Sequence, residues 1–92
     1  MDQVLAQFEK NTTEVVRVSL TEFRGHKLID LRVYYRDDEG QYRPTKKGVS
    51  ISVDLYTDFK RAMQALERAL LEHKLVTEED LEDASLVEVE EE

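Results

Sequence analysis

The fold of this chain is decided by residues 14–35, which run EVVRVSLTEFRGHKLIDLRVYY. Apolar and polar side chains alternate on both sides of Gly25, and this period of two is typical of strands that bury one face. Glycine adopts a positive φ more readily than any other residue, so residues 22–26 are expected to reverse the chain. The stretch therefore predicts two antiparallel strands, with Phe23 at the turn between them.

Two further strands are expected downstream of this pair. A turn at residues 37–40 (DDEG) leads into a short strand at residues 41–44, which Pro44 limits because it has no N–H to donate. A basic turn at residues 46–48 leads into residues 49–53, where apolar β-branched residues alternate with serine. Four consecutive strands joined by short turns predict an antiparallel meander.

The pattern then changes to the 3.6-residue period of an amphipathic helix. Asp54 is the expected N-cap, and the helix should reach about Leu75. Such a helix is about 30 Å long, whereas an average strand covers roughly 17–20 Å. Leu71 and Leu75 lie off the main stripe in the overhanging part, so a second copy of the chain is expected to cover them. The predicted dimer interface consists of Phe59, Met63, Leu66, Leu70, Leu71 and Leu75.

The chain is expected to form one domain with an appendage at each end. Residues 1–13 hold a small apolar cluster and predict an N-terminal arm or a short helix, and residues 14–76 form the domain. Residues 77–92 form an acidic tail with nine acidic side chains and no basic one. A capping box at Thr77 is compatible with a short helix over residues 77–84, and the last glutamates should repel one another and stay mobile.

Composition narrows the function classes. The chain has 92 residues and a net charge of −8. A chain of this length can form one modest core, which oligomerisation would stabilise further. Because it has no cysteine, thiol chemistry is excluded. It holds no apolar run of about 20 residues and no apparent leader, so neither a membrane partner nor export is expected. Most of the net negative charge lies in the tail, because residues 1–76 carry 13 basic and 12 acidic side chains. The basic side chains of residues 1–76 are concentrated in the strand region.

No catalytic or metal site is expected. The only histidines, His26 and His73, are too few and too far apart for a metal cluster, and no serine, histidine and acid form a triad pattern. Three scattered glycines cannot form a phosphate-binding loop. The sequence therefore predicts a protein that is not an enzyme and has no cofactor.

Aromatic residues lie among basic ones in the strand region. Phe23 is followed by Arg24, and Tyr34 and Tyr35 are followed by Arg36. An unpaired base gains about 1–3 kcal/mol by stacking on a ring, and the phosphates of a single strand favour a basic groove. The combination indicates binding of single-stranded nucleic acid. The alternative is that these rings are ordinary strand and turn residues.

Residues 18–35, with DEG at 38–40 and RPTKKGVSI at 43–51, resemble the positive cofactor four family of transcriptional coactivators. The similarity runs from about Val15 to Leu75 without a gap. The resemblance implies an α+β fold with a four-stranded curved antiparallel sheet (β-β-β-β-α), a long C-terminal helix, a homodimer formed through the helices, and kinship with the Whirly proteins. It also implies that the dimer grips two antiparallel single strands of DNA. The sequence lacks the basic, serine-rich N-terminal region of the eukaryotic members, so it resembles a bacterial or phage member of the family.

The resemblance also implies roles for individual residues. Its stacking aromatics correspond to Phe23 and Tyr35, the second of which is usually a tryptophan. Arg32 and Tyr35 have opposite strand parity, so both reach one groove only if the strand bends or bulges between them. The phosphate-contacting cations of the family correspond to Arg24, Arg32, Arg43, Lys46 and Lys47.

Some cationic positions of the family differ here. His26 replaces a usual lysine, although Lys27 follows it. Two cations of the family's first strand fall on Glu14 and Val16, and Arg17 would compensate for them only if the register differs. The candidate nucleic-acid contacts are therefore Arg17, Phe23, Arg24, His26, Lys27, Arg32, Tyr35, Arg43, Lys46 and Lys47.

The expected function is single-stranded DNA binding in transcription, replication or repair, in the cytoplasm of a bacterium and close to its nucleoid. Two alternatives stay open. The chain could bind RNA, or it could be an adaptor whose acidic tail binds a protein partner. Deleting residues 77–92 would abolish the adaptor function and spare binding, whereas Phe23→Ala and Tyr35→Ala would do the reverse.

Overall fold

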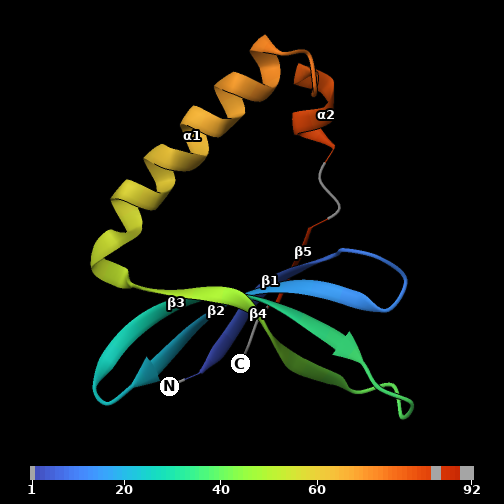
Figure 1. Ribbon diagram of the computed structural model, residues 1–92, viewed down its shortest axis with the longest axis vertical. Coiled ribbons are helices and arrows are strands. Elements are labelled where there is room, and N and C mark those ends of the chain that lie inside the picture. The colour runs from blue at the N-terminus through green and yellow to red at the C-terminus, as the bar shows by residue number, and fades with distance from the viewer. Residues whose placement is uncertain (1, 84–85, 90–92) are drawn as a thin grey trace. The chain divides into compact units, whose positions relative to one another are not determined.

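The computed structural model describes residues 2–83 and 86–89, which form two compact units. The sheet unit contains the strands β1 (Gln3–Glu9), β2 (Glu14–Phe23), β3 (His26–Arg36), β4 (Tyr42–Ser52) and β5 (Val87–Glu88). The helical unit contains α1 (Tyr56–Glu72) and α2 (Glu78–Glu82). Figure 1 shows the elements in chain order. The fold is α+β, with an antiparallel sheet followed by a long helix.

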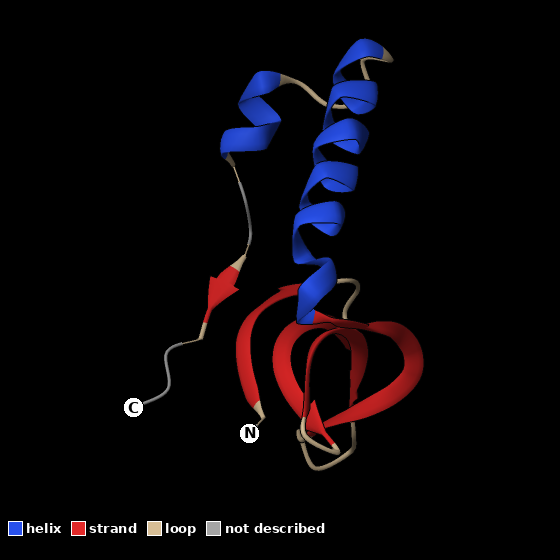
Figure 2. Ribbon diagram, turned by 90° about the vertical axis from the view of Figure 1, so that its left-hand side faces the viewer, coloured by secondary structure: helices blue, strands red, loops and turns tan. Residues whose placement is uncertain are grey.

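The sheet has the strand order β4-β3-β2-β1-β5, and each neighbouring pair is antiparallel. Strands β1 to β4 form an antiparallel meander, of which β2, β3 and β4 cover the region predicted to do so, and Figure 2 shows how strongly they curl. The predicted count of four strands is wrong, because the predicted strands correspond to β2, β3 and β4 and the sheet also contains β1 and β5. Val87 lies opposite Gln7, and the backbone N–H of Val89 donates to the carbonyl of Leu5 at 2.7 Å. Glu88 therefore belongs to a strand, and residues 90–92, predicted to be mobile, lie outside the described part.

The N-terminal segment is also a strand, not the predicted arm or short helix. β1 pairs with β2 along its length, but the register shifts between Val4 and Ala6. This bulge interrupts the period of two, which is why the apolar cluster of Val4, Leu5 and Phe8 did not indicate a strand. Asn11 then closes the β1–β2 turn, because its Oδ1 accepts from the backbone N–H groups of residues 13 and 14 at 3.0 and 2.9 Å.

The third and fourth predicted strands are one strand, β4, with a bulge in its middle. A single residue, Val33, separates the paired positions 32 and 34 of β3, whereas residues 45–47 separate Pro44 from Gly48 on β4. The Oγ1 of Thr45 donates to the carbonyl of Val33 at 2.7 Å and accepts from the N–H of Lys47 at 3.1 Å. The predicted basic turn is therefore a bulge, and Pro44 is accommodated because β4 is an edge strand.

The long helix begins and ends slightly inside its predicted limits. Residues 53–55 form a 3₁₀ turn, so the N-cap is Leu55 and not Asp54. At the other end Lys74 has a φ of 57°, and the N–H groups of Lys74 and Leu75 donate to the carbonyls of Leu71 and Leu70. This Schellman arrangement ends α1 at Glu72. In the short helix α2, Thr77 and Asp80 form a capping box.

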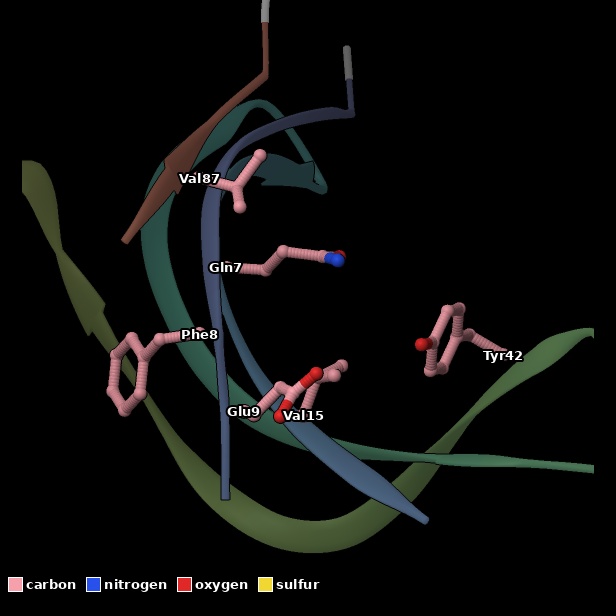
Figure 3. A pocket seen from close by; sticks show the side chains of 6 residues that line it. All are labelled: Gln7, Phe8, Glu9, Val15, Tyr42 and Val87. Atoms are coloured by element: carbon pink, nitrogen blue, oxygen red, sulfur yellow. The ribbon is translucent and has the colours of Figure 1, made fainter. Parts of the chain in front are cut away.

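The two faces of the sheet have opposite character. The polar face carries Arg17, Ser19, Asp30, Arg32 and Ser50, which are cross-strand neighbours. The apolar face carries Val16, Val18, Leu20, Ile29, Leu31, Val33, Val49 and Ile51. The polar face lies inside the curve (Figure 3), and the buried residues Val15, Ser19 and Asp30 all belong to that side. No residue of the apolar face is buried, and Val49 is 50% exposed.

Candidate nucleic-acid interface

An exposed aromatic ring and a cation share the tip of the β2–β3 hairpin. Arg24 and Gly25 have φ values of 53° and 81°, as in the two-residue turns that match the twist of a hairpin. Phe23 and His26 form the last cross-strand pair, and the ring of Phe23 is 61% exposed. The Arg24 guanidinium lies 5.1 Å from its centroid. The tip thus presents a stacking surface beside a positive charge, and it uses a strained non-glycine residue to do so.

The bulge of β4 presents two further cations, Lys46 and Lys47, at the free edge of the sheet. Both side chains are exposed, and neither forms an ion pair within the described part of the chain. The shape of the bulge depends on Gly48, because a Cβ there would clash with the carbonyl oxygen of Leu31. The lysines therefore extend from backbone that is held closely against β3.

Arg32 holds this bulge from the polar face. Its Nη1 donates to the carbonyl of Thr45 at 3.0 Å, and its Nε and Nη2 donate to the two carboxylate oxygens of Asp30 at 3.1 and 2.9 Å. Ser50 donates a further hydrogen bond to Asp30 at 2.5 Å. Burial raises the pKa of Asp30, but the hydrogen bonds from Arg32 and Ser50 outweigh it and hold the pKa below its usual value. The predicted phosphate contact at Arg32 is thus also a structural clamp.

Arg17 lies directly opposite Arg32 on the polar face and is packed between two rings. Its guanidinium carbon is 4.7 Å from the centroid of Tyr34 and 4.9 Å from that of Tyr42, and its Nε donates to Gln7 Oε1 at 3.0 Å. Tyr35 was among the predicted contacts, whereas Tyr42 and Gln7 were not. No short-range pattern could reveal this cluster, because it joins four strands.

The cross-strand register divides the predicted contacts between the two faces. Arg17, Phe23, His26 and Arg32 belong to the polar side. The apolar side carries Lys27, Tyr35 and Arg43. Lys47 lines a hollow of that face. A bulge does occur next to Arg32, as the parity argument required, but its extra residues are on β4, so β3 does not bring Arg32 and Tyr35 together.

Tyr35 is nevertheless accessible, since it is 44% exposed beside Glu14 and Arg43. The Nε of Arg43 donates to Asp37 at 3.0 Å, and two N–H groups of the turn also donate to that carboxylate. The hydrogen bonds from the Gln41 backbone, Arg43 and the Glu39 backbone lower the pKa of Asp37. Neither predicted stacking ring is in a hydrophobic interior.

The predicted dimer residues lie on or just after α1. Within the described helix no residue is buried, and Met63, Leu66 and Leu75 are 45%, 49% and 70% exposed. The six residues are thus available to a second copy, and their role stays a prediction. None of the described helices combines the length and apolar character needed to cross a bilayer. The described side chains contain no group of three or more histidine, cysteine or acidic residues suited to a metal ion.

The sequence profile of the family described as Transcriptional Coactivator p15 (PC4) matches residues 10–62. The chain is also similar to two RNA polymerase II transcriptional coactivators, KELP of Arabidopsis thaliana and SUB1 of Saccharomyces cerevisiae. They are 41% and 40% identical to it over 54 and 55 residues. Each match covers 59% of this chain but only 32% of KELP and 19% of SUB1, so the chain spans a third or less of these relatives.

The solved structures that resemble the chain include two PC4 homologues and a complex with single-stranded DNA. BPSL1147, a PC4 homologue from Burkholderia pseudomallei, is 27% identical with a TM-score of 0.67, over 72% of this chain and 89% of that one. A bacteriophage T5 homologue of PC4, implicated in recombination-dependent DNA replication, is 27% identical with a TM-score of 0.60, over 90% and 98%. MoSub1, solved in complex with single-stranded DNA, is 31% identical with a TM-score of 0.57, over 73% and 77%.

Proposed function

The chain belongs to the transcriptional coactivator p15 (PC4) family, as a member of bacterial or phage type, and we propose that it binds single-stranded DNA as a homodimer. The similarity to MoSub1, whose complex with single-stranded DNA is solved, supports the choice of ligand. The phage T5 homologue is implicated in recombination-dependent DNA replication, and KELP is a transcriptional coactivator, so this chain is proposed to act in DNA transactions of that kind.

The hairpin tip is the observation that carries the proposal. A large apolar ring at a tight turn with 61% of its surface exposed contributes little to folding. Beside it, Arg24 adopts a backbone conformation that disfavours side chains, where glycine or asparagine would be more stable. Both features are explained if Phe23 stacks on an unpaired base while Arg24 neutralises the adjoining phosphate.

The β4 bulge supplies the remaining charge. Lys46 and Lys47 are exposed, while the acidic side chains of Asp30 and Asp37 are already paired with Arg32 and Arg43. The negative charge on the sheet unit is therefore partly neutralised, and the two lysines are left for phosphates. Their contribution should appear in the salt dependence, which changes by about 0.7 in slope for each phosphate neutralised on a single strand.

A homodimer is proposed because neither unit covers its own apolar surface. The apolar face of the sheet contains a hollow of about 270 Å³, lined mainly by Val16, Leu31, Val33 and Val49. α1 exposes Met63 and Leu66 as well. A domain this small gains much of its stability from oligomerisation when it lacks a buried core. Sedimentation at micromolar concentration should give twice the 10.8 kDa of one chain, and a monomer would contradict the dimer.

Alanine variants test the DNA site. Phe23→Ala and Tyr35→Ala should each weaken binding of a labelled single strand by about 1–3 kcal/mol. Because the two rings emerge from opposite faces, their effects should add. Lys46→Ala with Lys47→Ala should flatten the salt dependence. Lys60→Ala with Arg61→Ala, which removes the same charge from α1, is the matched control. If the control and the bulge variant flatten it equally, the bulge is not a phosphate site.

The same measurement separates DNA from RNA, because an oligoribonucleotide of equal sequence can replace the DNA strand. We propose that the protein acts by binding alone, without an enzymatic step, and in the cytoplasm next to the nucleoid. Turnover of a bound oligonucleotide by purified protein would contradict the first of these statements. Fluorescence imaging of a tagged copy away from the DNA would contradict the second.

A further inference from the structure

A second hollow lies inside the curve of the sheet, apart from the hairpin tip and the bulge. It has a volume of about 330 Å³, at the small end of the range of ligand pockets. It is lined by Gln7, Phe8, Glu9, Val15, Tyr42 and Val87, which come from β1, β2, β4 and β5. Figure 3 shows that the side chain of Phe8 turns away from it, while the other five face it.

The chemistry of the hollow suits a flat, partly polar group. Val15 is buried at its floor, Val87 of β5 forms part of its wall, and the ring of Tyr42 lies across from β1. One side of it is thus apolar and aromatic. The guanidinium of Arg17 packs against Tyr42 and holds that ring in place. These groups provide a surface on which a nucleobase can stack.

Besides the Tyr42 hydroxyl, the polar groups of the hollow are an acceptor, the Glu9 carboxylate, and a donor, the Gln7 amide. The carboxylate of Glu9 makes no hydrogen bond or ion pair with the described residues. The Oε1 of Gln7 accepts from Arg17, so the Nε2 of the same amide keeps its two N–H donors. A phosphate would be repelled by Glu9, whereas a base that offers N–H groups would be attracted.

We propose that this hollow binds one unpaired guanine of the single strand through the carboxylate of Glu9. Guanine alone among the four bases presents two adjacent N–H donors, at N1 and N2, on its Watson–Crick edge, and a carboxylate can accept both. Its neighbouring O6 accepts a hydrogen bond, for which Gln7 Nε2 is the donor. Adenine and cytosine instead place a lone pair next to their single amino group, and this lone pair faces the carboxylate.

The inference rests on the proposed function, since it assigns base preference to the same protein–DNA complex. It predicts a protein that binds any single strand and binds tighter where a guanine can reach the hollow. A bidentate contact to a base discriminates against the other bases, so one guanine should improve affinity about tenfold.

Fluorescence anisotropy with three 20-nucleotide strands tests this assignment. The first is all thymine, the second carries one central dG, and the third carries inosine, which lacks the N2 amino group, at the same place. The wild-type protein should bind the dG strand about tenfold tighter than the thymine strand, and the inosine strand in between. A single guanine avoids four-stranded structures.

Glu9→Gln should abolish the gain from dG and leave thymine-strand affinity within about twofold. Glu39→Gln, the same chemical change in the exposed β3–β4 turn, should keep the gain. Equal affinity of the wild type for the thymine and dG strands, or a dG preference that survives Glu9→Gln, would overturn the assignment. Failure to bind the thymine strand at all would instead contradict the proposed function.

Discussion

Replacing Arg32 by glutamine should lower the free energy of unfolding substantially, because the guanidinium links β3 to the bulge of β4. It donates three hydrogen bonds, two to Asp30 and one to the carbonyl of Thr45. The side chain of Asp30 is only 9% exposed and that of Arg32 is 23% exposed. The substitution would leave a nearly buried carboxylate with Ser50 as its remaining side-chain donor.

The size of the effect follows from this burial. Removing one partner of a buried ion pair typically destabilises a protein by about 3–5 kcal/mol. Because water reaches part of Arg32, we expect the free energy of unfolding to fall by about 2–4 kcal/mol. In Asp30→Asn/Arg32→Gln no charge is left without a partner, so the double variant should be more stable than Arg32→Gln alone.

Urea unfolding followed by circular dichroism at one fixed protein concentration measures these differences. Arg36→Gln is the matched control, since it removes an exposed cation four residues further along β3 and should change the free energy of unfolding by less than about 0.5 kcal/mol. The clamp does not exist as described if Arg32→Gln is as stable as Arg36→Gln. The same holds if the double variant is no better than the single one.

Three further changes have defined outcomes. Arg24→Asn should reduce the backbone strain at a φ of 53° and raise the free energy of unfolding by about 0.5–1 kcal/mol, which thermal melts measure. The same variant should weaken single-strand binding and flatten the slope of log affinity against log salt by about 0.7, which anisotropy measures. Gly48→Ala forces a Cβ against the Leu31 carbonyl, so the free energy of unfolding should fall by about 1–3 kcal/mol or more. The melting temperature should fall accordingly. The pKa of Asp30 is lower in the folded than in the unfolded chain. Its stabilising effect is therefore complete above the unfolded pKa of about 4 and is lost as the pH falls through the folded pKa. Urea titrations below pH 5 should show a shallower loss for Asp30→Asn than for the wild type.

Much of the sheet could be predicted because its information is local. From residue 14 to residue 36 the register of β2 and β3 is uninterrupted, so the period of two in the sequence corresponds directly to the two faces. The apolar set that includes Val16, Leu31 and Val49 was identified for the same reason. The helix was predicted to within a few residues because a single stripe of apolar side chains runs along it.

The errors arose where the structure depends on contacts distant in sequence. The bulge near Leu5 conceals the alternation of β1, and β5 is too short to show a pattern and pairs with a strand about 80 residues earlier. The bulge of β4 contains residues that favour turns, and it is kept in the sheet by Thr45 and by the guanidinium of Arg32. The division of Phe23 and Tyr35 between two faces follows from register, which no single strand reveals.

The most direct test of the account compares one labelled 20-nucleotide strand with its duplex over a salt series. Bases stacked within a duplex offer no free faces to Phe23 or Tyr35, whereas phosphates are present in both ligands. We predict that the single strand binds at least tenfold tighter at every salt concentration and that the difference disappears in Phe23→Ala/Tyr35→Ala. Equal affinity for the two ligands in the wild type would contradict stacking as the basis of binding.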